Sequence, residues 1–325
     1  MGAGNWTRRR ILAAGAAAGL SWAGLNSRNS QAQTFGLKAA YNRFASQFQY
    51  FAAKEQKFFE AEGIKVEDAF TPPPVAIPGL LSGQYDLAFH NILDIAQINL
   101  KGSSVKILYP GAMLTDKFPY AQLVVPAGST VKTAKDLEGK KIGVAFLRSS
   151  IDLDVTIWLA ANGVDPKKVT FIGTGIDGVV PTIKSKQVDA AYVIEPALTV
   201  IKGQKLGEAI AVPPASQTGG GYMATGYIAR ESWIERNPDL AQAIVRALDK
   251  ATQWLIANPQ EIPGLISRNS GIPEPLARQM ILPGTTRMVR KADIQPYLDA
   301  AAKFGFIDRS LDACSLVSKF CPQAC

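Results

Sequence analysis

Residues able to hold a polar ligand follow apolar runs at four places in the chain. They are Asn42 with Arg43, then Thr71, then His90 with Asn91, and last Arg148 with Ser149 and Ser150. A guanidinium group grips an oxyanion through two hydrogen bonds, and hydroxyl, amide and imidazole groups add further donors. These residue types favour the binding of a small organic anion.

The same residues also have structural interpretations. Arg43 suits a solvated loop, and His90 suits a half-buried position that caps the next helix. Ser149 and Asp152 have the spacing of a capping box. Asp152 and Asp154 would repel a negative ligand if they faced it, so a neutral or zwitterionic ligand stays open beside the anion.

The last of the four places lies within a strand-helix-strand pattern. The apolar run 142–147 predicts a buried strand, the apolar face of 151–161 predicts a helix, and 169–172 predicts a second strand. Free backbone N–H groups at the start of such a helix can hold an anion. Arg148 is therefore the strongest single candidate.

The rest of the chain divides into two α/β lobes. Apolar runs alternate with helical periodicity over 37–109, which predicts a mostly parallel sheet flanked by helices. A strand at 122–126 leads out of this lobe, and a strand near 222–229 returns to it. We expect a first lobe at 33–126 and 222–310, a second lobe at 127–221 and a cysteine-bearing tail at 311–325. In open α/β sheets ligands bind at the carboxyl ends of strands, where the candidate residues lie.

Residues 1–32 have the features of an export signal. Arg8 and Arg9 stand in a twin-arginine motif, a mildly apolar segment follows, and small residues predict cleavage after Ala32. That segment is shorter than the roughly 20 residues a membrane span needs. We therefore expect a soluble protein in the periplasm.

The composition is that of a folded protein, with 47% apolar and 19% charged residues. The formal charge of +8 falls to +4 without residues 1–32, which hold four arginines and no acids. No basic stripe with interleaved aromatic residues is present, which argues against a nucleic-acid partner. We expect a monomer without a cofactor or metal.

All three cysteines lie near the end of the chain, at Cys314, Cys321 and Cys325. An oxidising compartment allows one disulfide among them and leaves one thiol over, and the spacing does not say which two pair. Zinc is a poor alternative, because the single histidine, His90, lies far away in the sequence.

An enzyme is the main alternative to a binding protein. Residues 173–178 match G-x-G-x-x-G after a strand, and Glu195 follows at about the distance of a ribose-binding acid, which would suit an NAD(P)-dependent oxidoreductase. Pro181 interrupts the helix that should hold the pyrophosphate, however. No catalytic set built on histidine, cysteine or a serine elbow is visible, so we expect no enzyme.

Five stretches of the chain, taken in order, resemble one protein family. They are AKEQKFFEAEGIKV at 53–66, LLSGQYDLAF at 80–89, DLEGKKIGV at 136–144, VDAAYVIEP at 188–196 and NPDLAQAIVRAL at 237–248. Together they are similar to the nitrate/sulfonate/taurine family of ABC-importer solute-binding proteins. The resemblance covers about residues 35–310 and leaves out the cysteine-bearing tail.

The resemblance implies a two-lobed periplasmic-binding-protein fold of the second type, with two crossing strands as a hinge and the ligand between the lobes. It also implies an inner-membrane permease as partner and a site role for Glu195, whose structural alternative is a partner for a nearby backbone N–H. Family ligands range from nitrate, taurine and alkyl sulfonates to pyrimidines and aromatic acids, so the ligand is not named. A sensor-input protein that binds the same ligand is a further alternative.

Overall fold

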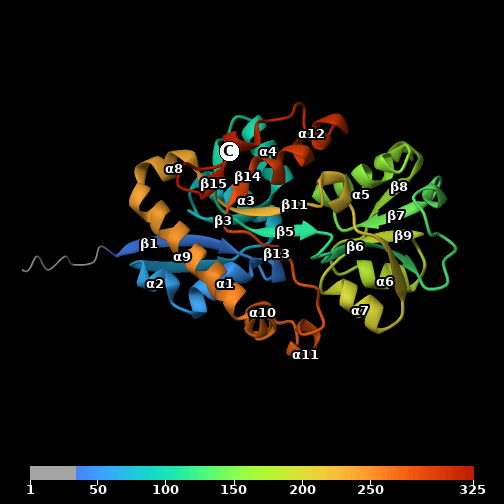
Figure 1. The fold of residues 1–325 in the computed structure, drawn as a ribbon, viewed down its shortest axis with the longest axis horizontal. Helices are drawn as coiled ribbons and strands as arrows, with labels where there is room; N and C mark the ends of the chain where they lie inside the picture. Colours follow the sequence, from blue (N-terminus) through green and yellow to red (C-terminus); the bar gives the residue numbers. More distant parts are fainter. Residues whose placement is uncertain (1–33) are drawn as a thin grey trace, which may run out of the picture. The chain divides into compact units, whose positions relative to one another are not determined.

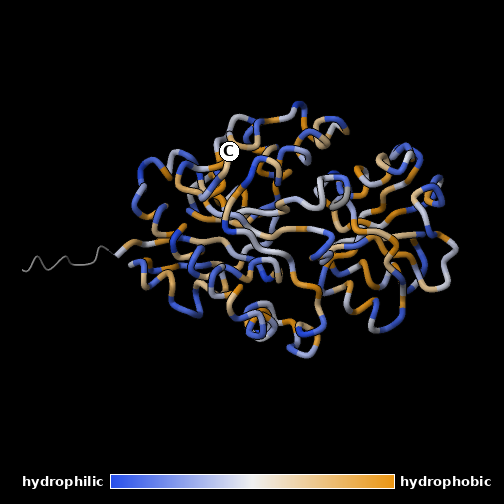
Figure 2. The backbone as a smooth tube through the Cα atoms, in the orientation of Figure 1, coloured by the Kyte–Doolittle hydropathy of each residue, from blue (hydrophilic) through white to orange (hydrophobic). Residues whose placement is uncertain are grey.

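The computed structural model describes residues 34–325, and the expected export signal at 1–32 lies outside the described residues. The described residues form two α/β lobes, each with a sheet flanked by helices (Figure 1), as the sequence predicts. Hydrophobic stretches follow the interior strands of both lobes (Figure 2). Across residues 34–325, no helix combines the length and hydropathy that crossing a membrane requires.

The first lobe is built on strands β1, β2, β3, β4 and β12. Their bounds are Phe35–Tyr41, Ile64–Phe70, Ala88–Asn91, Val105–Pro110 and Thr225–Arg230. β1 pairs in parallel with β2 and reaches β3 through a parallel bridge between Ala39 and Leu87. β12 lies between β3 and β4 and is antiparallel to both.

Helices cover both faces of this sheet. Side chains alternate along β12, so Tyr227 and Ala229 join one core cluster and Ile228 joins the other. The Tyr227 cluster contains α1 (Phe48–Glu55), α2 (Phe58–Ala61), α8 (Glu231–Arg236), α9 (Pro238–Ala257), α10 (Ile262–Ser270) and α11 (Glu274–Ala277). The Ile228 cluster contains α3 (Pro73–Ser82), α4 (Ile92–Leu100) and α12 (Gln295–Lys303).

The second lobe holds a five-stranded sheet in the order β10-β6-β9-β7-β8. The strands are β6 (Ala121–Pro126), β7 (Lys141–Val144), β8 (Thr170–Gly173), β9 (Ala190–Ile194) and β10 (Gly207–Ala211). Its helices are α5 (Ser150–Ala161), α6 (Val179–Lys184) and α7 (Ala197–Gly203). β6 and β9 are buried along almost their whole length, as expected for central strands.

The predicted strand at 142–147 is too long. β7 ends at Val144, and the side chains of Phe146 and Leu147 are 41% and 53% exposed. The apolar run predicted a buried strand because hydrophobicity alone does not distinguish a core strand from an apolar loop. These two side chains are therefore available at the surface of the second lobe.

The lobe boundary predicted at residue 126 is also displaced. β6 pairs with β9 and β10, so the strand at 121–126 belongs to the second sheet and does not lead out of the first lobe. The chain crosses after β5 (Ala112–Thr115) and returns before β11 (Gly221–Met223), and these two strands pair. A short strand, β13 (Gly284–Thr285), joins them to form the hinge sheet β11-β5-β13.

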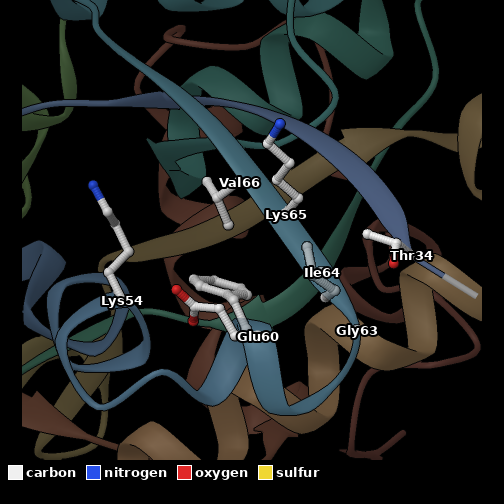
Figure 3. A pocket seen from close by; sticks show the side chains of 8 residues that line it. Thr34, Lys54, Glu60, Gly63, Ile64, Lys65 and Val66 are labelled. Carbon is white, nitrogen blue, oxygen red and sulfur yellow. The ribbon is translucent and has the colours of Figure 1, made fainter. Parts of the chain in front are cut away.

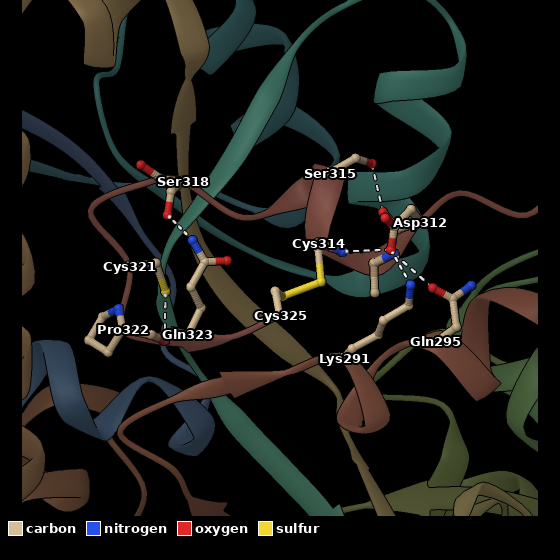
Figure 4. The surroundings of a disulfide bond; sticks show 11 residues. Lys291, Gln295, Asp312, Cys314, Ser315, Ser318, Cys321, Pro322, Gln323 and Cys325 are labelled. Atoms are coloured by element: carbon tan, nitrogen blue, oxygen red, sulfur yellow. Dashed lines mark hydrogen bonds and ion pairs between the residues drawn. A yellow bond between two sulfur atoms is a disulfide. The ribbon is translucent and has the colours of Figure 1, made fainter.

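The C-terminal tail is part of the first lobe, although the sequence predicted a separate surface segment. Val317 bridges Ile107 of β4, and the Ser318 amide donates to the Ile107 carbonyl at 2.9 Å. β15 (Gln323–Ala324) pairs with β14 (Val289–Arg290). Cys314 and Cys325 form the predicted single disulfide (Figure 4). Cys321 stays a buried thiol, and burial raises its pKa to about 12.

Replacing both Cys314 and Cys325 by serine should lower the free energy of unfolding by about 2–3 kcal/mol, because the crosslink closes a short loop in the unfolded chain. The two cysteines lie 11 residues apart. Urea unfolding of the oxidised protein and the double variant measures the difference. Reductant should lower the midpoint of the parent protein and leave the variant unchanged. If reductant does not change the urea midpoint of the parent protein, the disulfide does not stabilise the fold.

Candidate functional site

The carboxyl ends of the first-lobe strands β1, β2, β3 and β4 face the hinge. β1, β2 and β3 run in parallel, and β3 and β4 share a direction because both are antiparallel to β12. Pro110, the last residue of β4, lies just before the crossing strand β5. The loops that follow β1, β2 and β3 therefore lie on the hinge side of the lobe.

The parallel strands of the second sheet also have their carboxyl ends toward the hinge. β7, β8 and β9 are parallel to one another. Ile194 at the end of β9 pairs with Ala121, which begins β6 directly after the crossing. The carboxyl ends of both sets of parallel strands thus flank the hinge, and we call these two borders the interlobe edges. Ligands of open α/β sheets bind at such edges.

Asn42 and Thr71 hold the first-lobe loops in place. Both are buried. The Asn42 side chain accepts from the Phe44 amide at 3.0 Å, and the Thr71 hydroxyl donates to the Ala69 carbonyl at 3.0 Å. The Asn42 side-chain oxygen and the Thr71 hydroxyl proton are engaged with the protein itself, so the position of both residues at the interlobe edge has a structural cause.

Arg43 is the free cation of the first-lobe edge. Its side chain is exposed, and the guanidinium lies 4.9 Å from the centre of the Phe70 ring. Within residues 34–325 no ion pair joins Arg43 to a carboxylate. It lines a pocket of about 290 Å³ with Tyr41 and Lys54. This geometry keeps Arg43 available to an anion.

His90 and Asn91 are bound to the start of α4. The His90 ring lies with Nδ1 2.7 Å from an Asp94 carboxylate oxygen and Nε2 3.3 Å from the Pro73 carbonyl oxygen. Asn91 is the helix cap, because its side-chain oxygen accepts from the Asp94 amide at 2.9 Å. Nε2 is within hydrogen-bonding distance of Pro73, whereas the buried Nδ1 lies close to the Asp94 carboxylate without hydrogen-bond geometry.

The predicted capping box at the start of α5 is present. Asp152 accepts from the amides of Arg148 and Ser149 at 2.7 and 2.6 Å, and Ser149 accepts from the Ile151 amide at 3.3 Å. The Ser150 carbonyl accepts from the Tyr297 hydroxyl of α12 at 3.3 Å. The helix start is thus held by side chains of its own lobe and of the first lobe.

Arg148 links the two lobes directly. Its guanidinium donates to the Gly305 carbonyl at 2.7 Å and lies 4.8 Å from the Phe306 ring centre. Gly305 and Phe306 follow α12, and the Phe306 carbonyl accepts from Gln97 of α4. Arg148 therefore has a structural role, although the sequence indicated only a ligand-binding role for it. Its partner was not visible because it lies 157 residues away.

Glu195 is a hydrogen-bond partner of nearby backbone N–H groups, which is the structural alternative to a ligand-binding role. Its carboxylate accepts from the amide and hydroxyl of Thr199 at 3.0 and 2.9 Å and so caps α7. The Glu195 carboxylate also accepts from the amide of Ile281, which lies just before β13 of the hinge sheet, at 3.0 Å. Within residues 34–325, no hydrogen bond or ion pair joins Arg43 or His90 to a second-lobe candidate.

The two acids of α5 do not face a ligand. Asp152 serves the capping box, and Asp154 is buried where Tyr192 and Tyr222 donate to it at 2.9 and 3.0 Å. Burial raises the pKa of Asp154 to about 8, although the tyrosine hydrogen bonds act in the opposite direction. Asp152 and Asp154 therefore give no reason to expect repulsion of an anionic ligand.

The tyrosine cluster around Asp154 was missed in the sequence analysis. We define it as Tyr120, Tyr192, Tyr222 and Tyr297, which come from the crossing segment, β9, β11 and α12. Burial raises the pKa of all four phenols above the usual value. No short-range spacing joins them, so an isolated buried acid on a helix was the only available signal.

The glycine-rich loop at 173–178 follows β8, the edge strand of the second sheet. A dinucleotide loop lies at a switch point between strands, where a long helix can offer its start to the pyrophosphate. α6 has six residues and begins without a side-chain cap. Gly178 is required for packing, because an added Cβ would lie 1.9 Å from the Thr174 carbonyl oxygen. The geometry does not favour dinucleotide binding.

A pocket of about 330 Å³ lies at the other end of the first sheet (Figure 3). Thr34 precedes β1, Gly63 precedes β2, and Ile64 and Lys65 begin β2, so the pocket borders the amino ends of these strands. The candidate ligand residues lie at the carboxyl ends. This pocket is therefore not part of the interlobe site.

The family described as NMT1/THI5 like matches residues 46–262. The nitrate/nitrite binding protein NrtA of Nostoc sp. is 27% identical over 165 residues, which cover 49% of this chain and 36% of that protein. The 4-amino-5-hydroxymethyl-2-methylpyrimidine phosphate synthase of Schizosaccharomyces pombe is 24% identical over 64% of this chain and 62% of its own length. The chain thus matches less than two thirds of the length of either relative.

The periplasmic aliphatic sulphonate binding protein SsuA of Escherichia coli has a similar structure. The TM-score is 0.72 at 16% identity, and the match covers 88% of this chain and 93% of that protein. At this identity the likeness shows the fold alone, which is the two-lobed fold that the sequence predicts. The relatives named here are mostly binding proteins, and one is a synthase.

Proposed function

The chain belongs to the NMT1/THI5-like family, and from this premise we propose that it is a solute-binding protein for a small organic anion. The observation that carries the proposal is the common orientation of the two interlobe edges, which flank one hinge. Arg43 stands on one edge and Arg148 on the other. A negative ligand between the edges would meet a guanidinium from each lobe.

The proposed mechanism is closure of the lobes around the ligand. Two crossing strands, β5 and β11, connect the lobes, and a few residues at such strand ends can absorb a rotation. A ligand that touches both edges binds the closed form more tightly, and this difference shifts the population toward closure. Closure also removes water, which strengthens the polar contacts.

Delivery to an ABC-importer permease in the inner membrane completes the proposal. The names of the relatives support it, since they include a nitrate/nitrite binding protein and a periplasmic sulphonate binding protein. We propose a periplasmic monomer that acts without chemistry on its ligand and without nucleic acid. A sensor-input role uses the same site; loss of ligand uptake after deletion of the gene supports transport, and unchanged uptake supports sensing.

We propose lobe boundaries that follow the sheet pairing. The first lobe takes about 34–115 with 221–325, which includes the tail, and the second takes about 121–211. The ligand residues proposed from the sequence are kept with different roles. Arg43 and Arg148 contact the ligand, whereas Asn42, Thr71, His90, Asn91, Ser149, Ser150 and Glu195 hold the loops around it.

The test combines a stability screen with solution scattering. At a hundred times its dissociation constant a ligand adds about 2.7 kcal/mol to the free energy of unfolding, which a thermal-shift assay detects. Sulfonates, carboxylates, pyrimidines and inorganic anions form the screen. A stabilising anion should also reduce the radius of gyration. If no compound stabilises the protein, or if scattering is unchanged at saturation, the proposed function is wrong.

Changing Arg8 and Arg9 together to lysine should leave the precursor in the cytoplasm, because we propose that residues 1–32 are a twin-arginine signal. Fractionation of cells that express the full chain measures the distribution. The single change Arg28→Lys, outside the motif, serves as the control. Normal amounts of mature protein in the periplasm of the double variant would exclude this route.

A further inference from the structure

We infer that the ligand of this site carries a large flat hydrophobic group, of the aromatic sulfonate or aromatic carboxylate class. The inference rests on the proposed function and narrows its ligand. It is carried by six large apolar side chains that stay exposed at the interlobe edges and the crossing, which we call the apolar rim. They are Phe44, Phe70, Phe118, Phe146, Leu147 and Ile194, with exposed fractions of 40%, 52%, 36%, 41%, 53% and 36%.

The apolar rim has members on both lobes. Phe70 is the last residue of β2, and Ile194 is the last residue of β9. Phe146 and Leu147 lie in the loop after β7, and Leu147 reaches across to Gly173 at the end of β8. The members thus follow strand ends that border the hinge from both sides, and exposed apolar side chains that border one site favour a binding surface over chance exposure.

Phe118 places an aromatic ring in the segment between β5 and β6. Its ring lies so close to Gly284 that a Cβ there would be 2.7 Å from a ring carbon. Gly284 belongs to β13 of the hinge sheet. The ring is therefore held by the hinge itself, between the two edges that carry the other members of the rim.

Cations accompany the rim on the same rings. The guanidinium of Arg43 lies 4.9 Å from the Phe70 ring centre, and the ammonium of Lys117 lies 5.4 Å from that of Phe118. In the described part of the chain, neither cation forms an ion pair. A guanidinium binds an oxyanion in its plane and an aromatic group on its face. Such pairs suit a ligand with a charged head on a flat apolar body.

The polar groups of the site argue against a small, wholly polar anion. The side chains of Asn42 and Thr71 are bonded to the backbone, and Ser149 and Glu195 are bonded within helix caps. A nitrate or taurine molecule would need several free donors, but the hydroxyl protons of Thr71 and Ser149 are already donated to the Ala69 and Phe146 carbonyls. By contrast, the rim side chains are exposed, and among residues 34–325 Arg43 and Lys117 form no ion pair.

Calorimetry with one head group and growing bodies tests the inference. The ligands are methanesulfonate, benzenesulfonate and naphthalene-2-sulfonate, added to the mature protein. Each added ring buries more apolar area, so affinity should rise by about tenfold per step. If methanesulfonate binds as tightly as naphthalene-2-sulfonate, the inference is wrong while the proposed function stands. If none of the three and no other anion binds, the proposed function fails as well.

Substitutions in the apolar rim test whether these side chains bind the apolar body of the ligand. Phe70→Ala and Leu147→Ala should each weaken naphthalene-2-sulfonate binding by about fivefold or more, with a much smaller effect on methanesulfonate. Ile256→Ala is the matched control, because Ile256 is 59% exposed near the end of α9 and is not a member of the apolar rim. Equal losses in the control, or self-association of the protein that Phe70→Ala abolishes, would assign the rim to another purpose and overturn the inference.

Discussion

The free energy of unfolding should fall as the pH rises from about 4 to about 8, and Asp154→Asn should remove most of this fall. The cause is the buried carboxyl group of Asp154. Burial raises its pKa to about 8 because the charged form loses its hydration, although hydrogen bonds from Tyr192 and Tyr222 favour that form.

The sign follows from proton binding in the two states. Between pH 4 and 8 the unfolded state has ionised Asp154, whose ordinary pKa is about 3.9, while the folded state still binds the proton. A folded state that binds more protons loses stability as the pH rises, by at most about 1.4 kcal/mol for each pH unit. The contribution is complete below pH 4 and is lost once the pH passes the folded-state pKa.

Urea unfolding at a series of pH values measures this dependence. Asp154→Asn keeps an acceptor for the tyrosine hydroxyls but cannot ionise, so its curve should be flatter than that of the parent protein. Asp177→Asn is the matched control, since Asp177 is an exposed acid in the loop before α6 and its loss should leave the slope unchanged. Parallel curves for the parent protein and Asp154→Asn would contradict a buried neutral Asp154.

The same carboxyl group connects the lobes. Asp154 belongs to α5 of the second lobe, whereas Tyr222 belongs to the hinge strand β11 and Tyr297 to α12 of the first lobe. The Tyr222 and Tyr297 rings also stack, with centres 4.3 Å apart. The Asp154 carboxyl group and its tyrosine partners are therefore part of the contact between the lobes.

Local patterns in the sequence predict the local parts of this structure well. The capping box of Ser149 and Asp152 depends on a spacing of three residues, and the strands β1 and β2 depend on short apolar runs between turns. The periodic face of α9 likewise identifies Leu240, Ile244 and Leu248, which are buried. In each case the interaction joins near neighbours in the chain, so the pattern contains the cause.

The interactions that join distant segments could not be predicted in this way. The tyrosine cluster, the Arg148–Gly305 hydrogen bond and the pairing of the tail with β4 each bring together residues from separate elements. The lobe boundary fails for the same reason, because only strand pairing reveals that β6 belongs to the second sheet. Apolar content predicts that Phe146 is buried, and only the end of β7 shows that it is exposed.

Arg148→Ala should weaken binding of the proposed anionic ligand by about tenfold or more, the scale of a hydrogen bond to a charged group. The guanidinium carries the positive charge of the second-lobe edge and also bonds the Gly305 carbonyl of the first lobe. Its loss would remove a ligand contact and a contact that exists only when the lobes meet. Calorimetry gives the affinity, and scattering should show a smaller change on ligand addition.

Three substitutions at this position separate charge, contact and backbone effects. Arg148 has a φ of 57°, which is unfavourable for alanine and lysine but not for glycine. Arg148→Gly should therefore bind as weakly as Arg148→Ala yet be more stable by about 1 kcal/mol. Arg148→Lys keeps the charge without the planar fork and should bind with intermediate affinity. Arg246→Ala removes an arginine of α9 that pairs with Glu62, the residue after α2, and should leave affinity unchanged. Unaltered affinity in Arg148→Ala, or an equal loss in Arg246→Ala, would mean that the second-lobe edge does not hold the anion through Arg148.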